Sequence, residues 1–243
     1  MQPQAPAEAP AVAPGRPHYE VYRTAVPITL DGQLDEASWR QARPAGPLPL
    51  YDGNDAPHET FVRLLWDAQF LYIAFECDDP DIYATFTERD EALYSQDVVE
   101  VFISRPDPNA AEQGHFIEYE FSPAGVLFDS YLTAPFKGRL EWTADGLAAA
   151  GDVRGTPNKP ADRDGGYTVE IAIPFASIYR DPSNGPAAGN TQRANLYRID
   201  YSTPAPDKIG QAGTDAVFYT WSPTGKINFH MPQKFGTDRK SVV

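Results

Sequence analysis

The sequence predicts an all-β protein, a two-sheet antiparallel β-sandwich with few short helices. Short runs of aromatic and branched residues recur along the chain, each bounded by Pro, Gly, Asp or Asn, as expected for strands separated by turns. Proline is abundant, with 24 among 243 residues, about twice the usual share of roughly 5%, and this limits helix formation. Many short strands with few helices are typical of two packed sheets.

The clearest strand prediction is a hairpin formed by residues 61–66 and 70–77 and joined by a polar turn. Further runs have the same composition and boundaries. They are residues 98–104, 116–122, 126–132, 167–173 and 196–202. In residues 116–121 apolar and charged side chains alternate, which predicts a strand with one face exposed to water.

Only two short helices are predicted. Residues 35–42 begin with Asp35, a residue type that caps helix N-termini, and residues 175–179 follow Pro174. Each stretch is one or two turns long, so neither suggests a helical domain.

The chain divides into a predicted tether, residues 1–17, and a predicted single β-sandwich domain, residues 18–243. The tether contains five prolines among Ala, Gln and Glu, and such a segment cannot bury apolar surface. A frayed terminus is the alternative interpretation. The whole chain is 42% hydrophobic and 12% aromatic, which is enough to fill a core.

Charge and cysteine content argue against several classes of protein. With 20 Lys and Arg against 34 Asp and Glu, the net charge is −14, which disfavours a nucleic-acid partner. No apolar stretch reaches the roughly 20 residues of a membrane span. The single cysteine, Cys77, excludes an intrachain disulfide and is expected to be buried because it lies in an apolar run. No signal peptide is visible, so export requires that a signal has been removed.

A series of short motifs gives the sequence its most specific feature. Residues 31–39 read Asp-Gly-x-Leu-Asp-Glu-x-x-Trp, which alone predicts a turn, a helix cap and an apolar anchor. The following motifs are Leu-Trp-Asp and Leu-Tyr-Ile-Ala within 65–74, Asp-Asp at 78–79, Gln-Asp-Val-Val-Glu-Val-Phe at 96–102, Gly-Tyr-Thr-Val-Glu-Ile-Ala-Ile-Pro at 166–174, Trp-Ser at 221–222 and Pro-x-x-Phe-Gly at 232–236. In this order they resemble family 9 carbohydrate-binding modules over roughly residues 19–238.

The resemblance implies a β-sandwich that binds a sugar, such as the end of a glycan, between two aromatic side chains. The two tryptophans found there in sugar-binding members align with Tyr94 and Phe229. Tyr and Phe provide an aromatic face of smaller area than Trp. We therefore expect sugar binding that is weaker or altered in specificity.

The polar positions implied by the resemblance are partly changed. The glutamate of the Gln-Asp-x-Val-Glu motif is kept as Glu100 and can accept hydrogen bonds from sugar hydroxyls, whereas a family arginine aligns with Glu118. Replacing a donor by an acceptor changes which hydroxyl pattern fits. An Asn-rich loop survives as Asn228, and His230 stands where the family can have glutamine.

Structural calcium is a further implication of the resemblance. Carboxylate oxygens suit a hard cation, and the predicted ligands are Asp78, Asp79 and Asp81. Other acidic clusters lie at residues 88–91 and 162–164, and a solvated acidic surface is the alternative. No twelve-residue calcium loop of the EF-hand type is present, so a site must be assembled from separate loops.

The predicted function is therefore a non-catalytic carbohydrate-binding module. No catalytic residue is predicted, because the chain contains no His-x-x-x-His pair, Gly-x-Ser-x-Gly elbow or phosphate-binding loop. The module is predicted to bind an oligo- or polysaccharide outside the cell or in the periplasm, alone or with a polysaccharide-degrading system. The main alternative is a structural or interaction domain that has lost sugar binding.

A haem-binding electron-transfer domain is the least favoured alternative. Related sandwich domains hold haem between a methionine and a histidine or lysine, and here Met231 and His115 are the candidate ligands. His230 is adjacent to Met231, and neighbours in an extended strand point to opposite faces, which disfavours His230 as the second ligand. Met231 is equally well interpreted as an apolar filler.

Overall fold

The computed structural model describes residues 15–104, 114–179 and 185–241. Its strands are β1 (His18–Arg23), β2 (Thr60–Trp66), β3 (Phe70–Cys77), β4 (Val98–Ser104), β5 (Phe116–Phe121), β6 (Leu127–Leu132), β7 (Gly138–Arg139), β8 (Ala148–Val153), β9 (Tyr167–Pro174), β10 (Thr191–Ser202), β11 (Thr214–Thr220) and β12 (Gly236–Ser241). Its helices are α1 (Ala37–Gln41), α3 (Phe175–Ile178) and the 3₁₀ turns η1 (Leu93–Ser95), η3 (Pro206–Lys208) and η4 (Pro232–Lys234). Residues 1–14 of the predicted tether lie outside the described residues.

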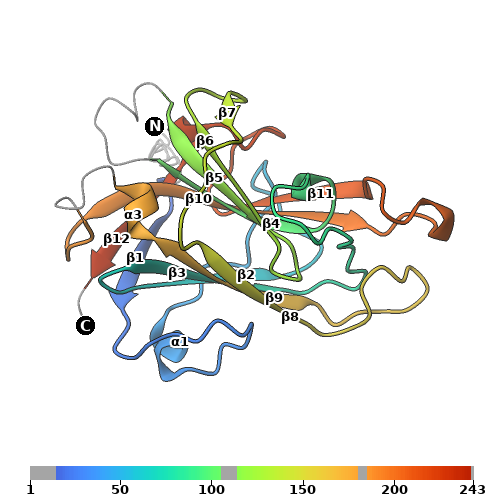
Figure 1. The fold of residues 1–243 in the computed structure, drawn as a ribbon, viewed down its shortest axis with the longest axis horizontal. Helices are drawn as coiled ribbons and strands as arrows, with labels where there is room; N and C mark the ends of the chain where they lie inside the picture. The colour runs from blue at the N-terminus through green and yellow to red at the C-terminus, as the bar shows by residue number, and fades with distance from the viewer. Residues whose placement is uncertain (1–14, 105–113, 180–184, 242–243) are drawn as a thin grey trace, which may run out of the picture.

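The strands form a single hydrogen-bonded sheet that curls over on itself. Its order is β7-β6-β5-β4-β10-β12-β1-β2-β3-β9-β8, with β11 paired to β10. Figure 1 shows one layer formed by β6, β5, β4, β10 and β11 above a second layer formed by β2, β3, β9 and β8, with α1 below. The all-β class is confirmed. The predicted division into two separate sheets is not, because β12 and β1 connect the layers along one edge.

The antiparallel pattern is interrupted at this connection. Strand β1 pairs in parallel with both β12 and β2, whereas the other strand pairs in the described chain are antiparallel. The first and last described strands of the chain therefore lie side by side. A parallel pair cannot be joined by a hairpin, and here the two partners come from opposite ends of the sequence.

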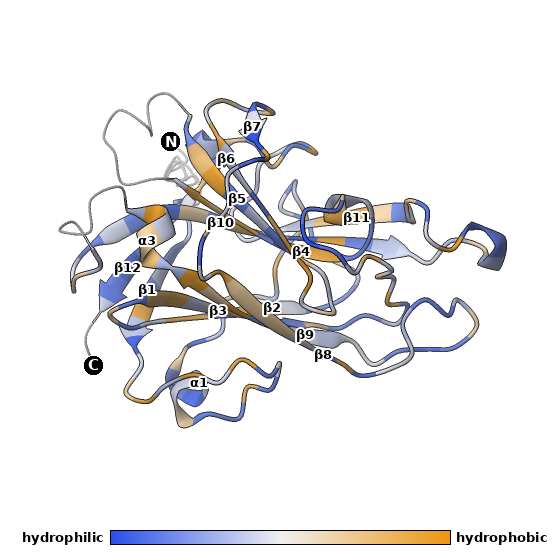
Figure 2. Cartoon of the chain, in the orientation of Figure 1, coloured by the Kyte–Doolittle hydropathy of each residue, from blue (hydrophilic) through white to orange (hydrophobic). Residues whose placement is uncertain are grey.

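The main core fills the space between the two layers. Val99 and Val101 of β4 and Tyr119 of β5 pack in the same apolar cluster as Phe75 of β3 and Ile171 of β9, and all five are fully buried. Figure 2 shows hydrophobic stretches on β5, whereas β12 is largely hydrophilic. Burying a large aliphatic or aromatic side chain stabilises a fold by about 1.5–3 kcal/mol, so this cluster contributes strongly to stability.

A second cluster lies on the outer face of β4, β5 and β10. Phe102, Phe116 and Tyr197 of these strands are covered by Leu93 and Phe235, which come from distant segments. All of β5 is consequently buried. The prediction that residues 116–121 have one face exposed to water is therefore wrong, because the chain around η1 and η4 covers the charged face.

The Asp-Gly-x-Leu-Asp-Glu-x-x-Trp motif forms the predicted turn and anchor beneath the second layer. The predicted helix cap at Asp35 is wrong, because α1 begins after Glu36 and has no side-chain cap. Glu170 of β9 accepts hydrogen bonds from the backbone N–H groups of Asp31 and Gly32 at 3.0 and 2.9 Å and from the Trp39 indole at 2.7 Å. Gly32 has φ +83°, and a Cβ there would lie 2.6 Å from the backbone nitrogen of Asp152. Only glycine fits this turn without displacement. The motif therefore has a structural role, because it holds α1 against the sheet.

None of the helices in the described part of the chain is long and apolar enough to cross a membrane. Cys77, at the end of β3, is buried as predicted.

Candidate functional site

A pocket of about 360 Å³ opens on the outer face of β4 and β5. It lies over the second apolar cluster, and its walls come from η1, from the segment before β7 and from the loop that precedes η4. The lining residues are Tyr94, Glu100, Glu118, Glu120, Phe128, Phe136, Ile199, Phe218, Ile227, Asn228, Phe229 and His230. The structure therefore brings together all six residues predicted as a ligand site, Tyr94, Glu100, Glu118, Asn228, Phe229 and His230.

The two predicted aromatic residues differ in exposure. Tyr94 is 55% exposed, whereas Phe229 is 7% exposed and stacks on Tyr197, with ring centroids 4.0 Å apart and an interplanar angle of 11°. The Tyr197 hydroxyl also donates a hydrogen bond to the Phe229 carbonyl at 3.0 Å. Phe229 is thus a wall fixed by packing, and Tyr94 is an aromatic face available to a ligand.

A third aromatic side chain at the pocket was not predicted. Phe136 is 71% exposed, and its ring centroid lies 4.2 Å from that of His230. It lies in the connection between β6 and β7 and has a φ of +60°. Nothing in the local sequence marks this position, because its approach to His230 depends on where the two loops meet.

Three carboxylic side chains project from one face of the sheet into the pocket. Glu100 of β4 is directly opposite Glu120 of β5 in the strand register. Side chains so paired have Cβ atoms about 4.5–5.5 Å apart. Glu118 lies two residues from Glu120 and hence on the same face, and its Oε2 is 3.4 Å from Nε2 of His230. Glu120 was not predicted as a site residue, although the alternation along β5 places it on the same face as Glu118.

The acidic groups in the pocket are deeply buried. Glu100 and Glu120 are each 2% exposed, and Oε2 of Glu120 has no hydrogen-bond partner. Burial, followed by repulsion from the neighbouring glutamates, raises the pKa of Glu100 well above its usual value. Burial and the charge of Glu118 do the same to the pKa of Glu120, against a smaller opposing effect of a backbone hydrogen bond from Tyr94. The pocket thus favours protonated carboxyls or a neutralising cation.

We expect the free energy of unfolding to fall as the pH rises from about 4.5, the usual pKa of these side chains, toward neutrality. In this range the unfolded carboxyls have lost their protons while those of folded Glu100 and Glu120 retain them, so stability decreases with pH. A Glu100→Gln, Glu120→Gln double variant should show a flatter dependence in urea unfolding at a series of pH values. Equal slopes for the two proteins would contradict the raised pKa values.

The other unpredicted lining residues are apolar, namely Phe128, Ile199, Phe218 and Ile227. Ile227 is 58% exposed, and the ring of Phe218 packs edge-on against that of Phe229 at 5.9 Å. Such residues resemble ordinary core residues in the sequence. Only the tertiary structure shows that they face the pocket.

A second acidic cluster lies away from this pocket. Carboxylate oxygens of Asp79, Asp97 and Asp200 all lie within 4.8 Å of one another. Nη2 of Arg198, a fully buried side chain, lies 2.9 Å from Asp79 and 3.1 Å from Asp200. Asp97 accepts hydrogen bonds from two backbone N–H groups, at 2.6 and 2.7 Å. A guanidinium therefore supplies the positive charge that a metal ion would otherwise provide.

Among the described residues, the acidic group that gathers within 4.8 Å contains Asp79 but neither Asp78 nor Asp81, the other two predicted calcium ligands. Asp79 pairs with Arg198, Asp81 accepts a hydrogen bond from the backbone of Thr203 at 3.0 Å, and Asp78 contributes its carbonyl to Arg198 at 2.9 Å. Burial raises the pKa of Asp79 to about 6. These residues do not fit a calcium site, and calcium elsewhere in the chain stays a prediction.

The haem alternative receives no support from the contacts of its candidate ligands. Nδ1 of His115 lies 3.1 Å from the hydroxyl of Tyr131, within hydrogen-bonding distance. Met231 is buried where the chain enters η4. Its burial is as expected for an apolar filler.

Fold and pocket together describe a β-sheet domain with a concave pocket lined by aromatic and acidic side chains. Residues 30–239 match the family described as "Carbohydrate family 9 binding domain-like", and the chain belongs to this family. This is a family of non-catalytic binding modules, in agreement with the predicted class.

Known proteins are similar to this chain in fold or in sequence, at low sequence identity. A carbohydrate-binding module of family 9 from Caldicellulosiruptor kristjanssonii, solved in complex with cellotriose, has a TM-score of 0.63 at 16% identity, covering 93% of this chain and 95% of that chain. The complex of a family 9 module from the same organism with glucose has a TM-score of 0.60 at 16% identity, covering 92% and 96%. A protein of Arthroderma benhamiae named "Extracellular protein" is 23% identical over 190 residues, 73% of this chain and 76% of the relative.

Proposed function

We propose that this protein is a non-catalytic module that binds a carbohydrate in the pocket formed by Tyr94, Phe229 and the glutamates of β4 and β5. The observation that carries the proposal is that all six residues predicted as ligand contacts line one pocket. Membership of the family supports it, as do the complexes of its structural neighbours with cellotriose and glucose.

The chemistry of the lining suits a sugar ring. Axial C–H groups of a sugar pack on an aromatic face, and Tyr94 and Phe136 present exposed rings at the pocket. Carboxylates accept hydrogen bonds from hydroxyls, and the amide of Asn228 can both donate and accept. A volume of about 360 Å³ lies within the range of small-ligand sites. We propose that the ring is held between Tyr94 and Phe229.

Replacing Tyr94 with alanine should weaken sugar binding about tenfold, and Phe136→Ala should do the same, because each removes an exposed aromatic surface. Isothermal titration with a panel of mono- and oligosaccharides measures the effect. Val26→Ala is the control, since Val26 is an exposed apolar residue outside the pocket. Unchanged affinity of both aromatic variants for a sugar that binds the parent protein would refute the site.

Phe229 is a poorer test of binding. Its ring is buried against Tyr197, so Phe229→Ala should also cost about 3–5 kcal/mol of stability. A loss of binding in that variant could come from the lost contact or from unfolding. Tyr94 and Phe136 are exposed, so their substitution tests binding without disturbing the fold.

The same titration distinguishes the interaction-domain alternative. If no sugar of the panel binds and circular dichroism shows that the protein is folded, the result would favour a domain that has kept the family fold without its sugar site. Repeating the titration with a chelator tests the calcium prediction.

We further propose an extracellular location, which the name of the fungal relative supports, and an association with polysaccharide degradation.

A further inference from the structure

The two buried acidic clusters of this protein differ in their counter-charge. The cluster of Asp79, Asp97 and Asp200 contains Arg198, whose guanidinium contacts two of the three carboxylates. The three glutamates of the pocket have no such partner. Among the described residues that line it there is no Lys or Arg, and His230 is the only basic side chain.

The pocket glutamates are also incompletely hydrogen-bonded. Oε2 of Glu120 is buried without a partner, and the side chain lies opposite Glu100 across the strand pair. Like charges placed directly opposite in a sheet are destabilising, and a buried polar atom without a partner is costly. A ligand stabilises these glutamates when it donates a hydrogen bond to Oε2 of Glu120 and carries a positive charge.

We propose that the carbohydrate recognised here carries a protonated amino group, as in glucosamine or an oligosaccharide with free amino groups. The inference rests on the proposed function and specifies its ligand. The ammonium donates to Glu120 and its neighbours, while the sugar ring packs between Tyr94 and Phe229 and beside Phe136. Aromatic faces attract cations as well as C–H groups, so the lining suits both parts of the ligand. The net charge of −14 also attracts a polycationic chain.

A metal ion fits this pocket less well than an ammonium group. A hard divalent cation takes six to eight oxygen ligands in a compact shell. Here the carboxylates share the pocket with aromatic and aliphatic side chains, and its volume of about 360 Å³ far exceeds that of an ion. The space beside the glutamates suits an organic ligand.

The test compares glucosamine, glucose and N-acetylglucosamine by isothermal titration of the full chain at one ionic strength, at a pH where the amine is protonated. Glucose lacks the amine, and acetylation removes its charge while keeping the ring. We expect glucosamine to bind about tenfold or more tightly than either neutral sugar, because hydrogen bonds between charged groups exceed those between neutral ones. This preference should fall severalfold in Glu120→Gln and in Glu118→Gln.

Glu76→Gln is the matched control. Glu76 lies on a strand, is paired with Arg63 and does not line the pocket, so the preference for glucosamine should persist in this variant. Circular dichroism verifies that each variant is folded. The two pocket variants differ in burial, since Glu118 is 9% and Glu120 2% exposed, so one remains informative if the other does not fold.

The outcomes separate this inference from the proposed function. Glucose bound as tightly as glucosamine would overturn the inference and leave carbohydrate binding intact. Absence of binding by all three sugars and by longer oligosaccharides, amino or neutral, would overturn the proposed function and the inference together. Ethylammonium bound as tightly as glucosamine would also overturn the inference, because the site would then recognise a cation without a sugar.

Discussion

Replacing Arg198 with methionine should lower the free energy of unfolding by about 3–5 kcal/mol. Arg198 is fully buried and pairs with Asp79 and Asp200, and its guanidinium lies over the rings of Tyr219 and Tyr167 at 4.9 and 5.5 Å. Methionine preserves much of the apolar stem but leaves buried carboxylates without a counter-charge. Urea unfolding followed by circular dichroism measures the change.

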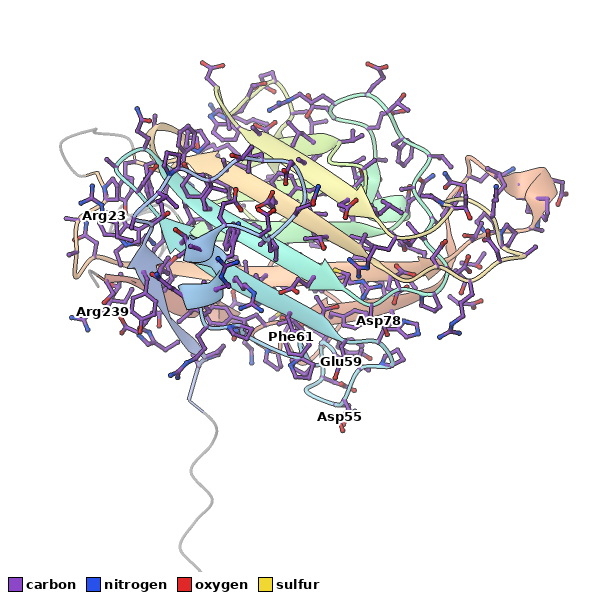
Figure 3. The ribbon with its side chains drawn as sticks, turned by 90° about the horizontal axis from the view of Figure 1, so that it is seen from below. Arg23, Asp55, Glu59, Phe61, Asp78 and Arg239 are labelled. Carbon is purple, nitrogen blue, oxygen red and sulfur yellow. The ribbon has the colours of Figure 1, made fainter. Side chains whose placement is uncertain are left out.

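The control for this prediction is Arg239→Met. Arg239 is 54% exposed, and its Nη1 lies 3.7 Å from Glu20, so the loss should remain below about 1 kcal/mol. Figure 3 shows Arg239 near the left edge of the molecule and Asp78, whose carbonyl Arg198 contacts, to the right of the centre. Equal losses in the two variants would show that the buried cluster does not depend on the charge of Arg198.

Substituting Glu170 with alanine should cost about 2–4 kcal/mol, because three donors lose their acceptor at once. These donors are the backbone N–H groups of Asp31 and Gly32 and the indole of Trp39. Trp39 is 1% exposed, so its N–H cannot turn to water instead. Glu170→Gln keeps one acceptor oxygen and should lose less. Thermal and urea unfolding report both variants.

A double-mutant cycle assigns this effect to the indole. Trp39→Phe removes the indole N–H, and its effect should be less than additive with that of Glu170→Ala. Glu76→Ala on the neighbouring strand β3 is the control, since its carboxylate is 41% exposed and pairs with Arg63 at 2.9 Å. It should lose less than about 1 kcal/mol. Full additivity in the cycle would mean that the two side chains do not stabilise each other.

These predictions assign different roles to acidic residues of similar appearance in the sequence. Glu170 fastens a turn and a helix to the sheet, and Asp79 neutralises a buried arginine. Glu120 faces a pocket with one oxygen unpartnered. Substitution of Glu170 or Asp79 should therefore lower the free energy of unfolding, whereas substitution of Glu120 should affect ligand binding.

Most central strands could be predicted from local sequence. Strand β3 has the bounds predicted for it, and β4 likewise, because aromatic and branched residues between turn residues specify a buried strand. Five strands were not predicted, namely β1, β7, β8, β11 and β12. Strand β8 reads Ala-Ala-Ala-Gly-Asp-Val and β12 reads Gly-Thr-Asp-Arg-Lys-Ser, neither with strong strand propensity. Pairing with β9 holds β8, and pairing with β10 and β1 holds β12.

Strand β12 also shows how tertiary contacts override composition. Asp238 and Lys240 are each 1% exposed and form an ion pair on one face of the strand. Burial raises the pKa of Asp238, and the charge of Lys240 opposes this. Charged residues in a chain end normally indicate exposure. Here both strands that pair with β12 lie far from it in the sequence, so the local sequence does not predict the burial of Asp238 and Lys240.

The sequence by itself determined the all-β class, the turn and anchor at residues 31–39, and six residues that the fold gathers around one pocket. The first two depend on local composition and turn residues, whereas the six pocket residues follow from the resemblance to family 9 carbohydrate-binding modules. Only the tertiary structure decided which charges are neutralised. Arg198 reaches Asp79 across more than a hundred residues of chain, whereas Glu100 and Glu120 meet across two paired strands without a described Lys or Arg beside them. Such pairings depend on distances in space, which the spacing of residues along a chain does not encode.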